Sequence, residues 1–215
     1  MEEKAILFDP TRCIGCRACQ VACKQWNDLK GETTANRGSY ENPCDLSPDT
    51  WMKIEWREVE RKGKIEWLYT FRTCFHCTDA QCEQACPVNA ISFTQEGFVV
   101  INYEECIGCG NCVDECPFDV PRIGNDGDET AMKCDACTSR IAEGESPACV
   151  KSCPVYALKF GDRKDLMKDG KERVKLLKAN GYSNACLYGE IEQGGLHVLS
   201  VLDDLPSVYG LKDFS

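Results

Sequence analysis

Apolar and polar residues alternate along two stretches in the first third of the chain. Between positions 51 and 59 the apolar residues oppose a row of charged ones that includes Lys53, and the same period of two returns between positions 64 and 71. This period predicts two β-strands, and the Arg-Lys-Gly segment 61–63 favours a turn between them. We therefore expect a β-hairpin.

One face of this hairpin carries four aromatic side chains. They either pack onto the rest of the protein or form a docking surface, since aromatic residues anchor many interfaces. The preceding stretch, Asn36–Pro48, is rich in turn formers and predicts a loop. The aromatic residues are Trp56, Trp67, Tyr69 and Phe71.

A different pattern begins after the last cysteine-rich segment. From Asp162 to Ala179, charged residues surround a sparse set of apolar ones, which predicts a surface helix that breaks at Gly170 and is stopped by Gly181. Leu196–Leu202 predicts a β-strand. The residues after it are expected to form an arm.

Cysteine changes this picture, because it supplies 18 of the 215 residues. Such a share is typical of secreted disulfide scaffolds or of metal sites. The first ten residues contain acids and no apolar run, so we expect no secretory signal and favour metal. No stretch is long and apolar enough for a membrane span. The formal net charge of −10 disfavours nucleic acid as a partner.

Most of the cysteines fall into four groups of four. Groups one and three have the spacing C-x2-C-x2-C-x3-C, and groups two and four have a wider middle gap. Proline follows the last cysteine of groups two, three and four. In chain order the groups are Cys13, Cys16, Cys19 and Cys23; Cys74, Cys77, Cys82 and Cys86; Cys106, Cys109, Cys112 and Cys116; and Cys134, Cys137, Cys149 and Cys153.

This spacing is typical of ligands for [4Fe–4S] clusters. Three thiolates two residues apart let a tight loop curl over one side of a cubane, and glycine helps the two Cys-Ile-Gly-Cys loops to bend. Zinc is normally held by two separated C-x2-C pairs and does not require a third cysteine at this spacing. The four runs therefore predict four [4Fe–4S] clusters.

Flanking patterns indicate which cysteines share a cluster. In two-cluster ferredoxins the fourth cysteine of each run ligates the other cluster. Residues 90–102 predict a hairpin that joins groups two and three into one module, and Ala5–Phe8 and Ala157–Phe160 are expected to pair as outer strands of a second module. The predicted ligand sets are Cys13, Cys16, Cys19 and Cys153; Cys74, Cys77, Cys82 and Cys116; Cys106, Cys109, Cys112 and Cys86; and Cys134, Cys137, Cys149 and Cys23.

The predicted fold class is α+β, with two interleaved ferredoxin-like modules, a β-hairpin insertion and a C-terminal extension of helix and strand. Residues 1–23 together with 130–161 are expected to form the outer module, and residues 74–129 the inner one. Residues 24–73 form the insertion, and residues 162–215 the C-terminal helix and arm.

Five further residues are candidates for a role although they are not among the sixteen predicted ligands. Cys44 and Cys186 are expected to be small buried hydrophobes. His76, inside group two, either tunes a cluster by hydrogen bonding or is a spacer or exposed loop residue. Lys133 either offsets local negative charge or is a solvated surface residue. His197 lies in a predicted strand and receives no role.

Motifs for catalysis are missing from the sequence, which has no G-x-G-x-x-G, P-loop, H-E-x-x-H or G-x-S-x-G. Four clusters in so small a chain must lie close together and would form an electron wire, so catalysis is expected in a partner subunit. The alternatives are a free polyferredoxin shuttle, which the long insertion and tail disfavour, and a zinc or disulfide structural module.

The chain resembles the iron–sulfur β subunit of Mo- or W-dependent formate dehydrogenases, within the four-cluster ferredoxin-like subunits of the dimethyl sulfoxide reductase superfamily. The resemblance implies a non-catalytic electron-transfer subunit, a large subunit with a Mo- or W-bis-pterin cofactor, and a cytochrome or other electron-acceptor protein. It also implies that the module of groups one and four lies nearer the catalytic subunit. The segments that carry it are 9–27, 41–51, 74–92, 106–123, 133–154 and 194–202.

Related enzymes remain alternatives: another Mo/W oxidoreductase of the dimethyl sulfoxide, polysulfide or nitrate type, a hydrogenase or a carbon monoxide dehydrogenase. Membrane-anchored members of the family end in a hydrophobic helix, whereas this tail is polar and mixed. We therefore expect no transmembrane segment. The expected place is the cytoplasm, or the exoplasmic (periplasmic) face if the chain is co-exported with a signal-bearing partner.

Overall fold

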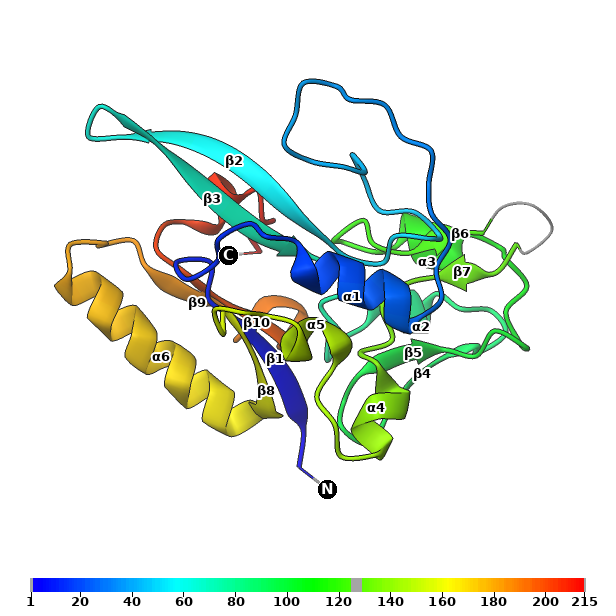
Figure 1. Cartoon of the computed structure of the whole chain (residues 1–215). Coiled ribbons are helices and arrows are strands. Elements are labelled where there is room, and N and C mark those ends of the chain that lie inside the picture. The colour runs from blue at the N-terminus through cyan, green and yellow to red at the C-terminus, as the bar shows by residue number, and fades with distance from the viewer. Residues whose placement is uncertain (1, 125–128, 215) are drawn as a thin grey trace.

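The structure is a computed structural model that describes residues 2–124 and 129–214. A sheet with one long helix beside it, a projecting hairpin and a group of short helices and strands make up the molecule (Figure 1). The mixture of helix and strand agrees with an α+β class. Within the described residues, none of the helices has both the length and the apolar character needed to cross a membrane.

The largest sheet has four strands in the order β8-β1-β10-β9. The central strand β1 (Lys4–Phe8) pairs antiparallel with β8 (Leu158–Asp162) and parallel with β10 (Val198–Leu202). The edge strand β9 (Cys186–Tyr188) pairs with β10. The expected pairing of the two outer strands is confirmed, and β10 adds the C-terminal part of the chain to the same sheet.

Successive residues of the central strands point to opposite faces of this sheet. On one face Leu7 and Leu199 pack beneath α6 (Arg163–Ala179). On the other face Ile6 and Val198 belong to a core that also contains several cysteines of the first and fourth runs. The sheet therefore supports the cysteine loops on one side and is covered by a helix on the other.

Helix α6 runs without interruption through Gly170, so the expected break there is wrong. Gly170 is buried, and a Cβ atom at this position would lie 2.7 Å from Cδ1 of Leu187. The glycine therefore allows the helix to approach the sheet closely. The helix ends at Ala179, shortly before Gly181, as expected.

The predicted hairpin consists of β2 (Lys53–Arg61) and β3 (Lys64–Arg72). Its turn residues Lys62 and Gly63 both have positive φ, as a two-residue turn of type I′ requires. Lys53 was expected on the polar face but is 1% exposed, because its Nζ donates to Glu41 and to the carbonyl of Cys44.

Most of the aromatic face of the hairpin packs onto the rest of the protein and does not form an exposed docking surface. Tyr69 and Phe71 are buried in the main core. The Trp56 ring lies 5.2 Å from the Tyr40 ring and 4.9 Å from the Tyr69 ring, and only Trp67 remains substantially exposed.

The remaining elements are short. The hairpin of β4 (Ile91–Phe93) and β5 (Val99–Ile101) confirms the strands expected between runs two and three. Four of the five short helices each carry the third cysteine of a run; α1 packs on α5, and α2 packs on α3. These elements are α1 (Ala18–Trp26), α2 (Gln81–Gln84), α3 (Asn111–Asp114), β6 (Arg122–Ile123), β7 (Ala131–Met132), α4 (Thr138–Ala142) and α5 (Ala148–Lys151).

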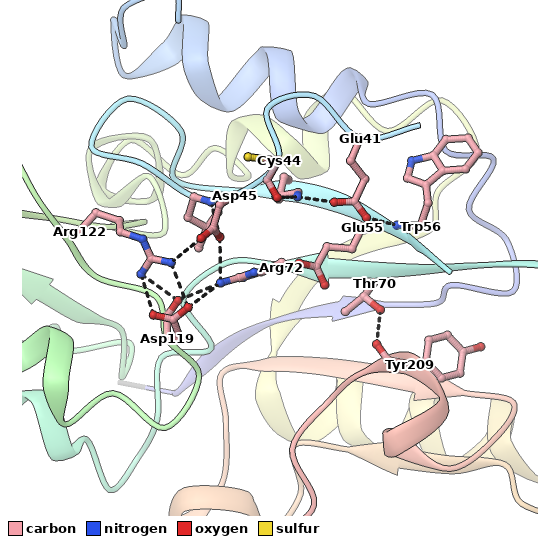
Figure 2. Close-up of polar contacts among 12 residues, drawn as sticks. Glu41, Cys44, Asp45, Glu55, Trp56, Thr70, Arg72, Asp119, Arg122 and Tyr209 are labelled. Atoms are coloured by element: carbon pink, nitrogen blue, oxygen red, sulfur yellow. Dashed lines mark hydrogen bonds and ion pairs between the residues drawn. The ribbon is translucent and has the colours of Figure 1, made fainter. Parts of the chain in front are cut away.

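Charged side chains fasten the insertion to the inner part of the molecule. Arg72 of β3 and Arg122 of β6 both pair with Asp45, from the loop before the hairpin, and with Asp119 (Figure 2). Arg72 also pairs with Glu55. Asp119 closely follows the third run, so these pairs link the insertion to that run.

The residues after β10 are packed and do not form the expected arm. They include the short 3₁₀ helix η2 (Pro206–Tyr209), which follows η1 (Glu192–Gly194) in the chain. Tyr209 is 1% exposed, its hydroxyl donates to Asp203, and its carbonyl accepts from the hydroxyl of Thr70 on β3 (Figure 2).

Candidate iron–sulfur sites

The first loop of each cysteine run bends in the same way. The residue two positions after the first cysteine has a positive φ: 65° at Gly15, 49° at His76, 64° at Gly108 and 60° at Ala136. Glycine adopts this left-handed conformation freely, whereas each of the other two residues is held there at a cost of about 1–2 kcal/mol. The sequence pointed to the two glycines only, yet all four runs form one kind of loop.

The first three cysteines of run one lie beside the last cysteine of run four. The pKa of the Cys13 thiol is raised to about 11, mainly by burial and additionally by the thiols of Cys16 and Cys153. The pKa of Cys19 is raised to about 12 by burial and then by the neighbouring thiols of Cys13, Cys16 and Cys153.

The converse arrangement holds for the last cysteine of run one. Burial raises the pKa of Cys23 well above its usual value, and the nearby thiols of Cys134 and Cys137 raise it further. Burial also raises the pKa of Cys149 strongly, with Cys134, Cys23 and Cys137 as the next causes. These four thiols lie together where α1 packs against α5.

Runs two and three are related in the same way, because the first three cysteines of run two lie beside the last cysteine of run three. The pKa of Cys82 is raised to about 12 by burial first and then by Cys74, with a smaller contribution from Cys116. The pKa of Cys77 is also raised, by burial and then by Cys74, Cys116 and Cys82.

The fourth set of neighbouring thiols combines the first three cysteines of run three with the last cysteine of run two. Burial raises the pKa of Cys112 to about 11, and the thiols of Cys106, Cys109 and Cys86 contribute in the same direction. These four cysteines line one small pocket.

Weaker interactions between groups reveal their order in space. Cys19 contributes to the raised pKa of Cys149, and Cys74 to that of Cys134. Cys112 contributes to the raised pKa of Cys82. Each spatial group is named here by its first cysteine in the chain. The Cys13 group neighbours the Cys23 group, the Cys23 group neighbours the Cys74 group, and the Cys74 group neighbours the Cys86 group; this succession is called the line of thiol groups.

The donor set suits an iron–sulfur core. Buried thiols with raised pKa values become thiolates only beside a cation, because a bare buried charge is costly. Backbone N–H groups are directed at several of these sulfurs: Gly15 donates to Cys13 Sγ at 3.4 Å, and Ala136 donates to Cys134 Sγ at 3.3 Å. Within the part of the chain that the structure describes, no three His, Cys, Asp or Glu side chains converge on a point that would hold a single ion.

Comparison with known proteins gives a consistent result. Residues 12–90 and 65–163 each match a 4Fe-4S dicluster domain family. The chain is 46% identical to the Formate dehydrogenase-O iron-sulfur subunit of Escherichia coli (strain K12) over 97% of this chain and 70% of the relative. It is 35% identical to the Formate dehydrogenase subunit beta of Megalodesulfovibrio gigas, over 86% of this chain and 87% of that protein.

The chain belongs to the family of formate dehydrogenase iron–sulfur subunits. A further relative, the Formate dehydrogenase 2 subunit beta (cytochrome c-553) of Nitratidesulfovibrio vulgaris, is 33% identical over 80% of this chain and 82% of its own length. Two dicluster domains imply four [4Fe–4S] clusters, which agrees with the four groups of thiols. The protein is an iron–sulfur subunit for electron transfer.

Two of the run cysteines of this iron–sulfur subunit are exposed at the surface. Cys16 and Cys109 are exposed, and they belong to the first and last groups of the line. The neighbouring Ile14 and Ile107 are also exposed. The line of thiol groups is therefore open to solvent at both of its ends.

Several residues other than the sixteen cysteines of the runs differ from expectation. Cys44 is exposed, so its expected burial is wrong, and Cys186 is half-buried with its Sγ 3.8 Å from the carbonyl of Asp204. His76 is fully buried, so an exposed loop residue is also wrong. His197 precedes β10, and its ring donates from Nδ1 to the carbonyl of His76 at 2.9 Å. Hydrophobic periodicity alone holds no signal for these contacts.

Proposed function

We propose that this chain relays electrons between a Mo- or W-bis-pterin catalytic subunit of a formate dehydrogenase and a downstream electron acceptor. The observation that carries the proposal is the line of four thiol groups, with an exposed cysteine in each end group. The clusters supply the one-electron chemistry when bound. The chain itself holds them in sequence, shields the middle of the line and contributes no catalytic residue.

Ligation is proposed to be crossed within each module. The first cluster is assigned to Cys13, Cys16, Cys19 and Cys153, and its partner to Cys23, Cys134, Cys137 and Cys149. Of the other two, one is assigned to Cys74, Cys77, Cys82 and Cys116, and the last to Cys86, Cys106, Cys109 and Cys112. Support comes from the mutual effects of these thiols on their pKa values and from the packing of α1 on α5 and of α2 on α3.

The modules are proposed to be interleaved, with residues 1–23 and 130–161 as the outer module around residues 74–129. The pairing of β1 with β8 and the separate β4–β5 hairpin support this division. Residues 24–73 and 162–215 then act as the insertion and the C-terminal extension that hold the modules together.

The two ends of the line are proposed to have different partners. The outer module, with Cys16, faces the catalytic subunit, and the inner module, with Cys109, faces the acceptor. A cytochrome suits the acceptor role, because cytochrome c-553 is part of one relative's name. The chain is proposed to work bound to its catalytic subunit, in the compartment to which that subunit is delivered.

The first test is anaerobic purification from the native host, with identification of co-purifying chains and a count of iron and acid-labile sulfide. About sixteen of each on this chain, together with a molybdopterin-containing partner that oxidises formate, are expected. The same count with a different partner would keep the electron wire but change the enzyme to another Mo/W oxidoreductase, a hydrogenase or a carbon monoxide dehydrogenase. A stable monomer without partners would favour a free polyferredoxin.

A second test addresses ligation by single substitutions. Cys23→Ala and Cys149→Ala are expected to disturb the same electron paramagnetic resonance signal, whereas Cys19→Ala disturbs a different one. The matched control is Cys44→Ala, which should leave every signal unchanged. If Cys23→Ala and Cys19→Ala disturbed one common signal, the crossed assignment would be wrong while the cluster count stood.

A further inference from the structure

A lysine is buried in the middle of the line of thiol groups. Lys133 directly precedes Cys134 and is 2% exposed, so the earlier alternative of a solvated surface residue is wrong. Its Nζ donates to the carbonyl of Val99 and, at 3.0 Å, to the carbonyl of Cys134. Across residues 2–124 and 129–214, no carboxylate forms an ion pair with it.

The electrostatic effect of Lys133 reaches thiols outside its own run. Its charge acts on Cys82 and Cys116, which belong to the Cys74 group, so the ammonium group lies near both of these side chains. Its carbonyl contact with Cys134 places it beside the Cys23 group as well. Lys133 therefore lies at the junction of the two middle groups.

The position of the Lys133 side chain is fixed by the β4–β5 hairpin. The carbonyl of Val99 accepts from Lys133, while the N–H of Val99 donates to Nδ1 of His76 at 3.1 Å. The pKa of His76 is well below its usual value, because of burial and then of the charge of Lys133. Val99 therefore holds the buried Lys133 ammonium group on one side and the His76 ring, which lies between Cys74 and Cys77, on the other.

We infer that Lys133 raises the reduction potential of the cluster bound by Cys74, Cys77, Cys82 and Cys116. Reduction adds one electron, supplied by a neighbouring cluster in the line, to a site whose core and thiolates already carry a net charge of about −2. A positive charge held nearby in a medium of low dielectric constant favours the reduced form. The inference rests on the proposed ligand sets and adds a residue that tunes one of them.

The test is a redox titration of the holoprotein with its catalytic subunit, followed by electron paramagnetic resonance. In Lys133→Gln the equilibrium constant for reduction of one cluster is expected to fall at least tenfold, which is about 59 mV for one electron. The clusters at the two ends of the line should shift least, because Coulomb interactions weaken with distance. Lys133→Arg keeps the charge and should retain most of the native potential.

The chain offers a matched control in its other buried lysine. Lys53 is 1% exposed, and its Nζ binds Glu41 and the carbonyl of Cys44. Lys53→Gln should leave all four potentials unchanged. If Lys133→Gln loses iron, Lys133→Met replaces it in the comparison with Lys133→Arg, because methionine keeps much of the side-chain length.

The outcomes separate the inference from the proposed function. Full iron and sulfide in a Lys133 variant with four native potentials would overturn the inference and leave the electron wire intact. An equal shift in Lys53→Gln would overturn it too, as would an equal loss of potential in Lys133→Arg. A wild-type protein with far fewer irons than four clusters require would instead overturn the proposed function.

Discussion

The same four residues, Cys-Ile-Gly-Cys, occur in two loops at opposite ends of the line of thiol groups. The backbone angles of their glycines are almost identical, with φ of 65° at Gly15 and 64° at Gly108. Their surroundings differ. A Cβ atom at Gly15 would lie 2.5 Å from Cζ2 of Trp56, whereas one at Gly108 would lie 2.1 Å from the carbonyl oxygen of Glu129.

This difference separates what the motif determines from what the rest of the chain supplies. The motif sets the bend of the loop, because two closely spaced ligands need a residue that tolerates a positive φ. The atoms that cover each loop come from elsewhere in the chain: the aromatic side chains of Trp56 and Tyr69 at Gly15, and the main chain of Glu129 at Gly108. A side chain can move aside more easily than a backbone carbonyl, so the two loops should respond unequally to the same change.

The largest effect is expected from Gly108→Ala. Backbone strain costs about 1–3 kcal/mol, and the clash with the main chain at Glu129 adds about 1–3 kcal/mol. The variant should lose the cluster of the Cys86 group, measured as about a quarter of the iron on the chain. Gly110→Ala is the matched control, because it also has a positive φ but no atom within 4 Å of the added Cβ. Equal iron loss in both variants would show that strain alone decides.

A smaller effect is expected from Gly15→Ala, because the added methyl group meets the ends of side chains. The backbone strain of about 1–3 kcal/mol remains, and so does the contact with Cε1 of Tyr69 at 2.7 Å, but the clash with the Trp56 ring is expected to be relieved in the double variant with Trp56→Leu. The measurement is the temperature at which the visible absorbance of the clusters is lost. If the double variant were no more stable than the sum of the single changes predicts, Trp56 would not be the obstacle.

The smallest effect on stability is expected from Ile14→Ser and Ile107→Ser. Both side chains are exposed, so each change should alter the free energy of unfolding by less than about 0.5 kcal/mol. Affinity for the catalytic subunit should fall only for Ile14→Ser, because that end of the line is proposed to face it. Equal binding by both variants would contradict the proposed orientation of the two ends.

Much of the architecture could be predicted because short-range patterns determine it. The β2–β3 hairpin follows from alternation and a Lys-Gly turn, and the pairing of β1 with β8 follows from matching flanks around the cysteine runs. The runs themselves identified the cluster chemistry, because few metal centres other than iron–sulfur clusters need three cysteine ligands at that spacing.

Other features depend on contacts between distant segments, which such patterns do not record. The position of Lys53 predicts solvent exposure, and a solvated surface residue was one of two alternatives for Lys133. Each is buried, because carbonyl groups from elsewhere in the chain accept hydrogen bonds from its ammonium group. Gly170 looks like a helix breaker in a local window, but the close approach of Leu187 gives it a packing role. The cover of the two Cys-Ile-Gly-Cys loops was missed for the same reason.

The place of β1 between β8 and β10 has a consequence for biogenesis. Strand β1 pairs with β8 and β10, which are translated much later than β1, whereas the β4–β5 hairpin forms from neighbouring residues. Long-range pairing of this kind is slow, and domains generally fold as their residues emerge. Runs two and three, which flank this hairpin, can therefore take shape during translation. The thiols of run one, which follows β1, must wait exposed until β8 and β10 have been made, so run one is the part of the nascent chain that most needs protection from oxidants.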